Sequence, residues 1–328
     1  MLVINAGNAN AGTGLAGEKD LELLLNSLSS MTGVEIKNIL PFSTGVIGER
    51  LKIKSLTSAF EECSKSLKKN NFNNLATSIM TTDKKVKISK KVVKIGNKKF
   101  SILGVAKGVG MIEPNMATTL SFVFTDLKIA ESSLKKIHKS ICNETFNSIS
   151  IDGDQSPSDS SILVATGKNL INSSKLLQTF KKSLEVVFTE LSEKLLLDGE
   201  GATKLIEIEV SGLKSKTACK EVAKKIANSP LLKTAAYGED PNWGRILSAA
   251  GNTKHKFLAK NVSIKIGQIK VLNKGEIHKK YREALGKKEF KKQRISLAVN
   301  LGPSKHCAKV KSSDLTHEYV SINSDYRS

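Results

Sequence analysis

Arginine and aromatic side chains are scarce in this chain of 328 residues, although its formal net charge is +21. A positive charge of that size would ordinarily favour a nucleic-acid partner. Only five of the 52 basic residues are arginine, however, and the recognition of phosphates and base edges relies on the guanidinium fork. Aromatic residues make up 5% of the chain, too few for a base-stacking surface. We therefore predict no nucleic-acid partner. A basic RNA-binding protein is the alternative from a different class, and RNA binding that persists in moderate salt would favour it.

Long apolar runs and clustered metal ligands are also missing. No stretch approaches eighteen consecutive apolar residues, so we predict no membrane span. The start of the chain, "MLVINAGNANAGTG", turns polar within five residues, unlike a signal peptide, and we expect a cytoplasmic location. The four cysteines and five histidines are dispersed, which predicts reduced thiols and neither a metal site nor another cofactor.

Helical and strand-like periodicities alternate along the chain, which predicts an α/β (α+β) fold with helical layers packed on sheets. Residues 1–4 are predicted as a strand, 18–31 as a helix that Gly33 ends, and 35–42 as a strand followed by a loop at 43–49. Residues 85–106 alternate around "GNK", as in a β-hairpin. The other expected elements are helices ending near 69 and at 131–147, 175–197 and 216–228, a short buried strand at 160–167, and strands at 121–125, 203–212, 261–272 and 294–301.

Three loops are rich in small residues: "NAGNANAGTG" (5–14), "STGVIG" (43–48) and "KGVGM" (107–111). Glycine lets backbone N–H groups approach a ligand closely, where they can bind a phosphate or stabilise an oxyanion. None of the loops matches the P-loop or the dinucleotide-binding pattern. Ordinary tight turns therefore remain the simpler explanation of each loop taken alone.

The segment "KGVGMIEPNMATTLSFVFTD" (107–126) changes at its middle from a Gly-rich loop to an apolar strand. Thr118 and Thr119 lie at this change, after the small residue Ala117. A hydroxyl nucleophile needs a base, and the sequence has neither a Ser/His/Asp arrangement nor a GxSxG elbow. Cleavage before a threonine would free an α-amine, of pKa near ~8, that can serve as the base for the hydroxyl beside it. Alternatively, both threonines simply begin the strand as β-branched residues.

Several long motifs follow one another along the chain: "NAGNANAGTG", "STGVIGE", "SIMTTD", "AKGVGMIEPNMATTLSFVFTD", "DGDQSPSDSSILVATG", "GEGATK", "YGEDPNWGRILSAAG" and "NSDYRS". With these motifs the chain resembles, over essentially its whole length, the ornithine acetyltransferases, the ArgJ family of glutamate N-acetyltransferases in arginine biosynthesis. The resemblance implies a layered helix–sheet sandwich of the ArgJ/DmpA-like, self-cleaving N-terminal-nucleophile type.

The resemblance also implies a reaction. The precursor would cut itself between Ala117 and Thr118 into an α chain (1–117) and a β chain (118–328). The Thr118 hydroxyl would take the acetyl group of N2-acetyl-L-ornithine, release L-ornithine, and pass the acetyl group to L-glutamate in a ping-pong mechanism. Thr44 and Gly45 would form the oxyanion hole. The implied substrate contacts are Thr81, Lys107, Thr118, Glu200, Asn323 and Ser328.

Several points stay open at the level of sequence. Acetyl-CoA is a second possible acetyl donor, and the resemblance suggests an assembly of two α and two β chains. Family members normally carry several tens of residues before "NAGNANAGTG", so the α chain is short relative to the family, and a truncated, inactive copy is one alternative. Another is a related N-terminal-nucleophile aminopeptidase, which would hydrolyse the acyl intermediate. We interpret Arg245 as structural support near the site. Asp152, Asp154 and Asp159 are interpreted as hydrogen-bonding loop residues rather than metal ligands.

Overall fold

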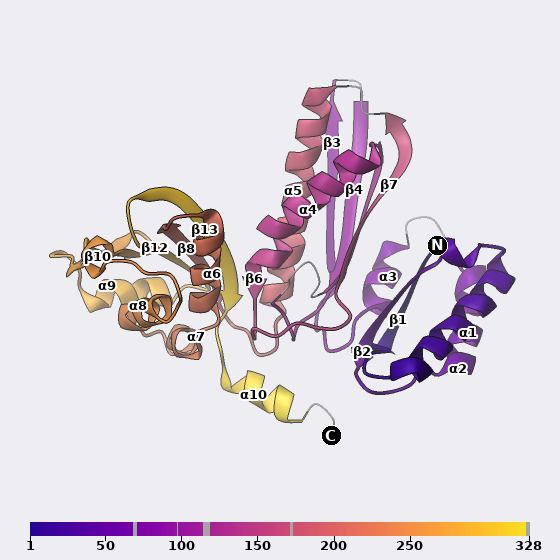
Figure 1. Ribbon diagram of the computed structural model, residues 1–328, viewed down its shortest axis with the longest axis horizontal. Helices are drawn as coiled ribbons and strands as arrows, with labels where there is room; N and C mark the ends of the chain where they lie inside the picture. The colour runs from indigo at the N-terminus through magenta and orange to yellow at the C-terminus, as the bar shows by residue number, and fades with distance from the viewer. Residues whose placement is uncertain (68–70, 97, 114–118, 171–172, 326–328) are drawn as a thin grey trace. The chain divides into compact units, whose positions relative to one another are not determined.

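The computed structural model describes residues 1–67, 71–96, 98–113, 119–170 and 173–325. The chain forms two compact units (Figure 1). The first takes its described residues from 1–108, 119–138 and 155–187, and the second from 109–113, 139–154 and 188–325. This spatial division differs from the predicted chain break after Ala117, which concerns a covalent bond and stays a prediction.

The strands are β1 (Leu2–Asn8), β2 (Leu40–Val46), β3 (Lys87–Ile95), β4 (Lys98–Lys107), β5 (Leu120–Lys128), β6 (Ile149–Ser150), β7 (Ser160–Leu170), β8 (Leu205–Gly212), β9 (Ser263–Ile266), β10 (Ile269–Asn273), β11 (Glu276–Ile277), β12 (Arg294–Asn300) and β13 (Ser304–Ser313). The α-helices are α1 (Gly14–Thr32), α2 (Ile53–Lys65), α3 (Phe72–Ser78), α4 (Glu131–Glu144), α5 (Ser174–Leu197), α6 (Lys216–Ala227), α7 (Pro230–Tyr237), α8 (Trp243–Gly251), α9 (Glu283–Phe290) and α10 (His317–Ser324). None of the helices in the described ranges has the length and apolar character needed to cross a membrane.

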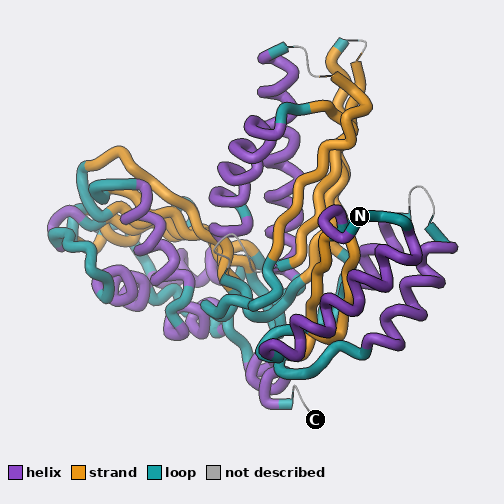
Figure 2. Tube along the Cα trace, turned by 45° about the vertical axis from the view of Figure 1, so that its right-hand side comes forward, coloured by secondary structure: helices purple, strands orange, loops and turns teal. Residues whose placement is uncertain are grey.

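The first unit is layered. Strands β1 and β2 pair in parallel. Leu24 and Leu28 of α1 pack with Val3 of β1 and with Leu51, which precedes α2, and α2 adds partly buried apolar side chains. The other side of this strand pair packs on the sheet β3-β4-β5-β7, where the rings of Phe42 and Phe122 lie 5.0 Å apart. The sheet's opposite face is covered by the parts of α4 and α5 that belong to this unit (Figures 1 and 2).

The second unit is built on one sheet with the strand order β11-β10-β9-β12-β8-β13-β6. Helices α6, α7, α8 and α9 contribute buried residues to the same apolar core as strands β8, β9, β10, β12 and β13. β8 alternates buried and half-buried side chains, as its sequence pattern predicts for a strand with one face in the core. Its neighbours differ in direction, since β12 runs parallel to it and β13 antiparallel.

Mixed sheets and helices confirm the predicted fold class. Gly33 ends α1 with φ +68°, and the hairpin of β3 and β4 forms where it was predicted. The predicted loop at 43–49 is wrong in its first half, because Ser43–Val46 extend β2 and pair with β1. The strand predicted as short and buried at 160–167 is β7, an 11-residue strand that lies at the sheet edge and buries its side chains only partly.

Candidate active site

The parallel pairing of β1 with β2 holds the predicted oxyanion residues. Thr44 lies opposite Ala6, and Gly45 opposite Gly7. Gly45 has φ +130°, and a Cβ atom there would lie 2.3 Å from the carbonyl carbon of Gly7. Only glycine fits that position, because a side chain would both strain the backbone and collide with the neighbouring strand. The close approach of the two backbones fixes Thr44, which is buried.

Lys107 is the last residue of β4 and brings three of the predicted residues together. Its ammonium donates to the Thr81 hydroxyl at 2.7 Å and to the Thr44 hydroxyl at 3.1 Å. It also lies 3.8 Å from Oδ2 of Asp83. Side chains alternate along a strand, so Lys107 shares the face of Leu103 and Val105, which packs toward β1 and β2. We call Thr44, Thr81, Asp83, Lys87 and Lys107 the lysine cluster.

Asp83 is the counter-ion at the centre of the lysine cluster. Its Oδ1 accepts from Lys87 Nζ at 2.6 Å and from the Gly108 backbone N–H at 2.8 Å. Burial alone would raise the pKa of Asp83, but the ammoniums of Lys87 and Lys107 outweigh it and hold the pKa below its usual value. Burial also lowers the pKa of Lys107, and Asp83 offsets part of this effect. The ion pair of Lys87 and Asp83 is almost completely removed from solvent.

Thr119 would be the second residue of the predicted β chain, directly after Thr118. It is connected to the lysine cluster through the backbone. Its hydroxyl donates to the carbonyl oxygen of Lys107, and its own carbonyl accepts from the Ser160 N–H at 2.9 Å. The next residue, Leu120, pairs directly with Lys107 across β4 and β5. The start of β5 is therefore held beside the end of β4 on which Lys107 stands.

Glu200 and Asn323 come together in the second unit. Asn323 Nδ2 donates to Glu200 Oε2 at 2.9 Å, from the last turn of α10. The backbone N–H of Glu200 donates to the Val109 carbonyl at 3.0 Å, and a Cβ at Gly110 would lie 2.8 Å from Glu200 Oε2. Glycine at position 110 thus lets the "KGVGM" segment pass close to this carboxylate. Burial, with nearby carboxylates that include Glu200, raises the pKa of Tyr319 in α10 to about 12.

The other interpreted residues have structural partners. Asp152 accepts from the N–H groups of Met111 at 2.6 Å and Ile112 at 2.8 Å, and Asp159 accepts from that of Ser156 at 3.0 Å. Burial raises the pKa of Asp152. Arg245 donates to the Leu231 carbonyl at 2.7 Å. These contacts agree with the interpretation of Asp152, Asp159 and Arg245 as supports. Asp154 contributes through its backbone, whose N–H donates to Asp152 Oδ1 at 3.2 Å.

The predicted site residues thus fall into two described groups. Thr44, Gly45, Thr81 and Lys107 lie together in the first unit, and Glu200 and Asn323 lie together in the second. Ala117, Thr118 and Ser328 lie outside the described residues. The sequence prediction missed Asp83 and Lys87. The one signal for Asp83 was its place in the "SIMTTD" motif, whereas Lys87 is one of many lysines in a strand-like segment.

The geometry of the first group suits acyl-transfer chemistry. The buried ammonium of Lys107 orients the hydroxyls of Thr44 and Thr81, next to position 45 of β2, where only glycine fits. Such preorganised donors stabilise a developing oxyanion without reorganising. The layered α/β fold and this cluster therefore indicate an enzyme. Its hydrogen-bond donors are held in position by the pairing of neighbouring strands.

Known proteins agree with this assignment. The ArgJ family model matches residues 1–328. The arginine biosynthesis bifunctional protein ArgJ of Bradyrhizobium diazoefficiens is 41% identical over 335 residues, which cover 100% of this chain and 81% of that protein. The protein of the same name from Methylococcus capsulatus is 38% identical over 99% of this chain and 81% of its own. The crystal structure of ArgJ from Bacillus halodurans, 36% identical, aligns with a TM-score of 0.59 over 62% of this chain and 98% of that chain. The chain belongs to the ArgJ family, and the prediction of an enzyme of this family is confirmed.

Proposed function

We propose that this enzyme moves the acetyl group of N2-acetyl-L-ornithine to L-glutamate, with Thr118 as the nucleophile after cleavage of the Ala117–Thr118 bond. Support comes from the family, whose two relatives described above are named arginine biosynthesis bifunctional proteins. The observation that carries the proposal is the pairing of Lys107 with Leu120, reinforced by the bond from the Thr119 hydroxyl to the Lys107 carbonyl. Thr119 is one peptide bond from Thr118, and consecutive Cα atoms are about 3.8 Å apart. The proposal thus puts the nucleophile one residue before a segment that is held beside Lys107.

The first step of the proposal is self-cleavage. The Thr118 hydroxyl oxygen attacks the Ala117 carbonyl carbon, the C–N bond breaks, and the chain passes through an ester. Breaking the C–N bond frees the α-amine of Thr118, which takes up the hydroxyl proton. Water then hydrolyses the ester, which frees the carboxyl group of Ala117 and the hydroxyl of Thr118. That amine, with an ordinary pKa near ~8, accepts the hydroxyl proton in each later turnover.

In turnover, the Thr118 oxygen attacks the acetyl carbonyl of N2-acetyl-L-ornithine. The negative charge that develops on the carbonyl oxygen is stabilised at Thr44 and Gly45. Because the Thr44 oxygen accepts a hydrogen bond from Lys107, its own proton is left to be donated to that charge. The C–N bond of the donor breaks, and L-ornithine leaves with the proton held by the α-ammonium of Thr118. The amine of L-glutamate then attacks the acetyl-threonine ester and gives a proton to the Thr118 α-amine. The ester C–O bond breaks, N-acetyl-L-glutamate leaves, and the proton returns to the Thr118 oxygen.

The charged residues of the two described groups match the substrates. Both amino acids carry a carboxylate, which suits the Lys107 ammonium and the Thr81 hydroxyl. Ornithine also carries a side-chain ammonium, which suits the Glu200 carboxylate that Asn323 orients. We further propose that the fragments stay together as two α and two β chains, which the mass of the native particle would test.

The reaction is tested by incubating the purified protein with N2-acetyl-L-ornithine and L-glutamate and following both products. The proposal predicts N-acetyl-L-glutamate and L-ornithine in equal amounts, and double-reciprocal plots with parallel lines for the two substrates. Free acetate without N-acetyl-L-glutamate would instead indicate the aminopeptidase-like hydrolysis. Replacing the donor with acetyl-CoA in the same assay tests the second donor.

A further inference from the structure

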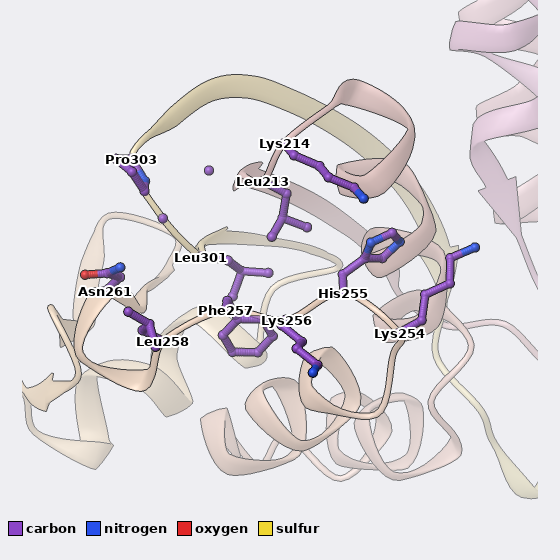
Figure 3. Close-up of a pocket in the computed structure, with 12 residues that line it drawn as sticks. Leu213, Lys214, Lys254, His255, Lys256, Phe257, Leu258, Asn261, Leu301 and Pro303 are labelled. Carbon is purple, nitrogen blue, oxygen red and sulfur yellow. The ribbon is translucent and has the colours of Figure 1, made fainter.

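The second unit contains a pocket of about 520 Å³ that the proposed reaction does not use. Three segments form it: residues 212–214 at the end of β8, residues 254–258 with Asn261 after α8, and residues 301–303 between β12 and β13. Its volume lies in the range of small-molecule sites, roughly 300–1,000 Å³. Figure 3 shows Leu213, Phe257 and Leu301 at its centre, with the basic side chains spread from Lys214 at the top, past His255 and Lys254 on the right, to Lys256 at the bottom.

The position of this pocket in the sheet favours a ligand. Strands β8 and β12 are parallel neighbours, so their carboxyl ends meet at one edge, and the pocket lies just beyond both. In open parallel α/β sheets, ligands bind outside the carboxyl ends of the strands, and this parallel pair offers the same kind of edge within a mixed sheet. The two chain segments also approach closely, because a Cβ at Gly212, where φ is +94°, would lie 2.3 Å from the Gly302 nitrogen. Helix α6 begins two residues after Lys214, with its positive end toward this segment.

The charge around the pocket is of one sign. The described residues that line it include Lys214, Lys254, His255 and Lys256, and none of them is acidic. Glu221, outside the lining, accepts from His255 at 2.8 Å and pairs with Lys254 at 2.9 Å. Within the described part of the chain, Lys214 and Lys256 form no ion pair. Two ammoniums therefore remain to neutralise an incoming anion.

We propose that this pocket binds a small phosphorylated molecule with an apolar or planar portion, the chemistry of a nucleoside diphosphate. Lysine ammoniums are compact point charges that can bind phosphate oxygens, and the lining supplies two of them, Lys214 and Lys256, without an ion-pair partner in the described chain. The floor of Leu213, Leu301 and Phe257 takes the apolar portion. This site goes beyond the proposed acetyl transfer and does not depend on it.

The test is isothermal titration calorimetry of the full chain with ADP, pyrophosphate and adenosine, in the absence of any acetyl donor. ADP is expected to bind more tightly than either pyrophosphate or adenosine, since it uses both the charged side and the apolar floor. The double variant K214Q/K256Q should weaken ADP binding at least tenfold. The matched control K265Q/K270Q removes two exposed lysines of β9 and β10 outside the pocket and should bind ADP within twofold of the unchanged protein.

All four lysines are exposed, so both double variants should keep the unfolding temperature of the unchanged protein. The proposal is overturned by an absence of ADP binding at millimolar concentration, or by equal ADP affinity in the two double variants. Pyrophosphate binding as tight as that of ADP would equally contradict it, because the apolar floor would then contribute nothing. None of these outcomes bears on acetyl transfer, which is measured separately.

Discussion

Asp83 neutralises two lysines that the fold has removed from water. Lys87 and Lys107 are 1% and 7% exposed, so neither ammonium is well hydrated. A charge in such surroundings is tolerated only when it is paired and hydrogen-bonded. The carboxylate meets this need for both lysines and at the same time accepts from the Gly108 backbone. It therefore connects the end of β4 with the segment that carries Thr81.

Replacing Asp83 by asparagine should lower the free energy of unfolding by about 3–5 kcal/mol, since buried positive charge would be left without a counter-ion. Urea unfolding at pH 7 measures this. Because the folded-state pKa of Asp83 is lowered, its contribution is present above the ordinary value of 3.8 and is lost as the pH falls through the folded-state pKa. The exposed pair of Glu61 and Lys65 supplies the control: Glu61→Gln should leave the free energy of unfolding almost unchanged. Equal effects of the two substitutions would contradict the role given to Asp83.

Thr44 is expected to act on the reaction rather than on the fold. Thr44→Val should lower kcat about 10²–10³-fold, as the loss of one oxyanion donor does in other enzymes. Thr44→Ser keeps the hydroxyl and should retain most of the activity. Steady-state kinetics of acetyl transfer, with urea unfolding of both variants alongside, separate the two effects. An unchanged kcat in Thr44→Val would remove this residue from the oxyanion hole.

Lys233 should make the free energy of unfolding depend on pH in the alkaline range. Its ammonium is buried in the second unit, where it donates to the Ser313 carbonyl at 2.5 Å and to the Ser312 hydroxyl at 3.1 Å. Burial lowers its pKa from the ordinary 10.5 to about 8. Between these two values the unfolded chain holds more of this proton than the folded chain, so the lysine makes the free energy of unfolding rise with pH.

Lys233→Met should therefore reduce the slope of the free energy of unfolding against pH between about 8 and 10 by up to about 1.4 kcal/mol per pH unit. Unfolding in urea at a series of pH values measures the slope. Lys265→Met, which removes an exposed lysine, should leave the slope as it is. A slope that is the same in both variants would show that Lys233 titrates normally.

At the scale of elements, the β1–β2 pair depends on two strands passing each other at glycine. Gly45→Ala should destabilise the first unit by more than about 3 kcal/mol, because the Cβ would strain a backbone at φ +130° and overlap Gly7. Gly48 has φ +86° but no atom within 4 Å of a built Cβ, so Gly48→Ala isolates the backbone strain, about 1–2 kcal/mol. Chemical unfolding compares the two. If both variants lost the same free energy, the close approach of the strands would not be what selects glycine.

The elements also show what a sequence can and cannot predict. Hairpin β3–β4 and helix α1 were predictable because their patterns and their end signal, Gly33, are local. Ser43–Val46 looked like a loop because the partner that makes them a strand lies 38 residues earlier in the chain, at Asn5–Asn8. Separation in sequence also hid the lysine cluster, since Lys87 and Asp83 meet Lys107 only after β4 has returned along β3. The motifs predicted which residues matter, and the pairing of strands determines which of them touch.

At the scale of the whole molecule, the proposed reaction depends on a single covalent change. The lysine cluster and the Glu200–Asn323 pair are preformed in the described chain, and the proposed mechanism assigns the base for the threonine hydroxyl to neither of them. The freed amine of Thr118 is the proposed source of that base. Activity should therefore appear only in protein that has been divided between residues 117 and 118.

Mass spectrometry of the denatured, purified protein, paired with the transfer assay on the same sample, tests this most directly. The account predicts two fragments, 1–117 and 118–328, with Thr118 at the N-terminus of the second, and a rate of transfer that rises in proportion to the cleaved fraction. Thr118→Ala should stay as one chain and transfer no acetyl groups, whereas Thr118→Ser should still cleave. An undivided chain that transfers acetyl groups to L-glutamate at the full rate would contradict the account.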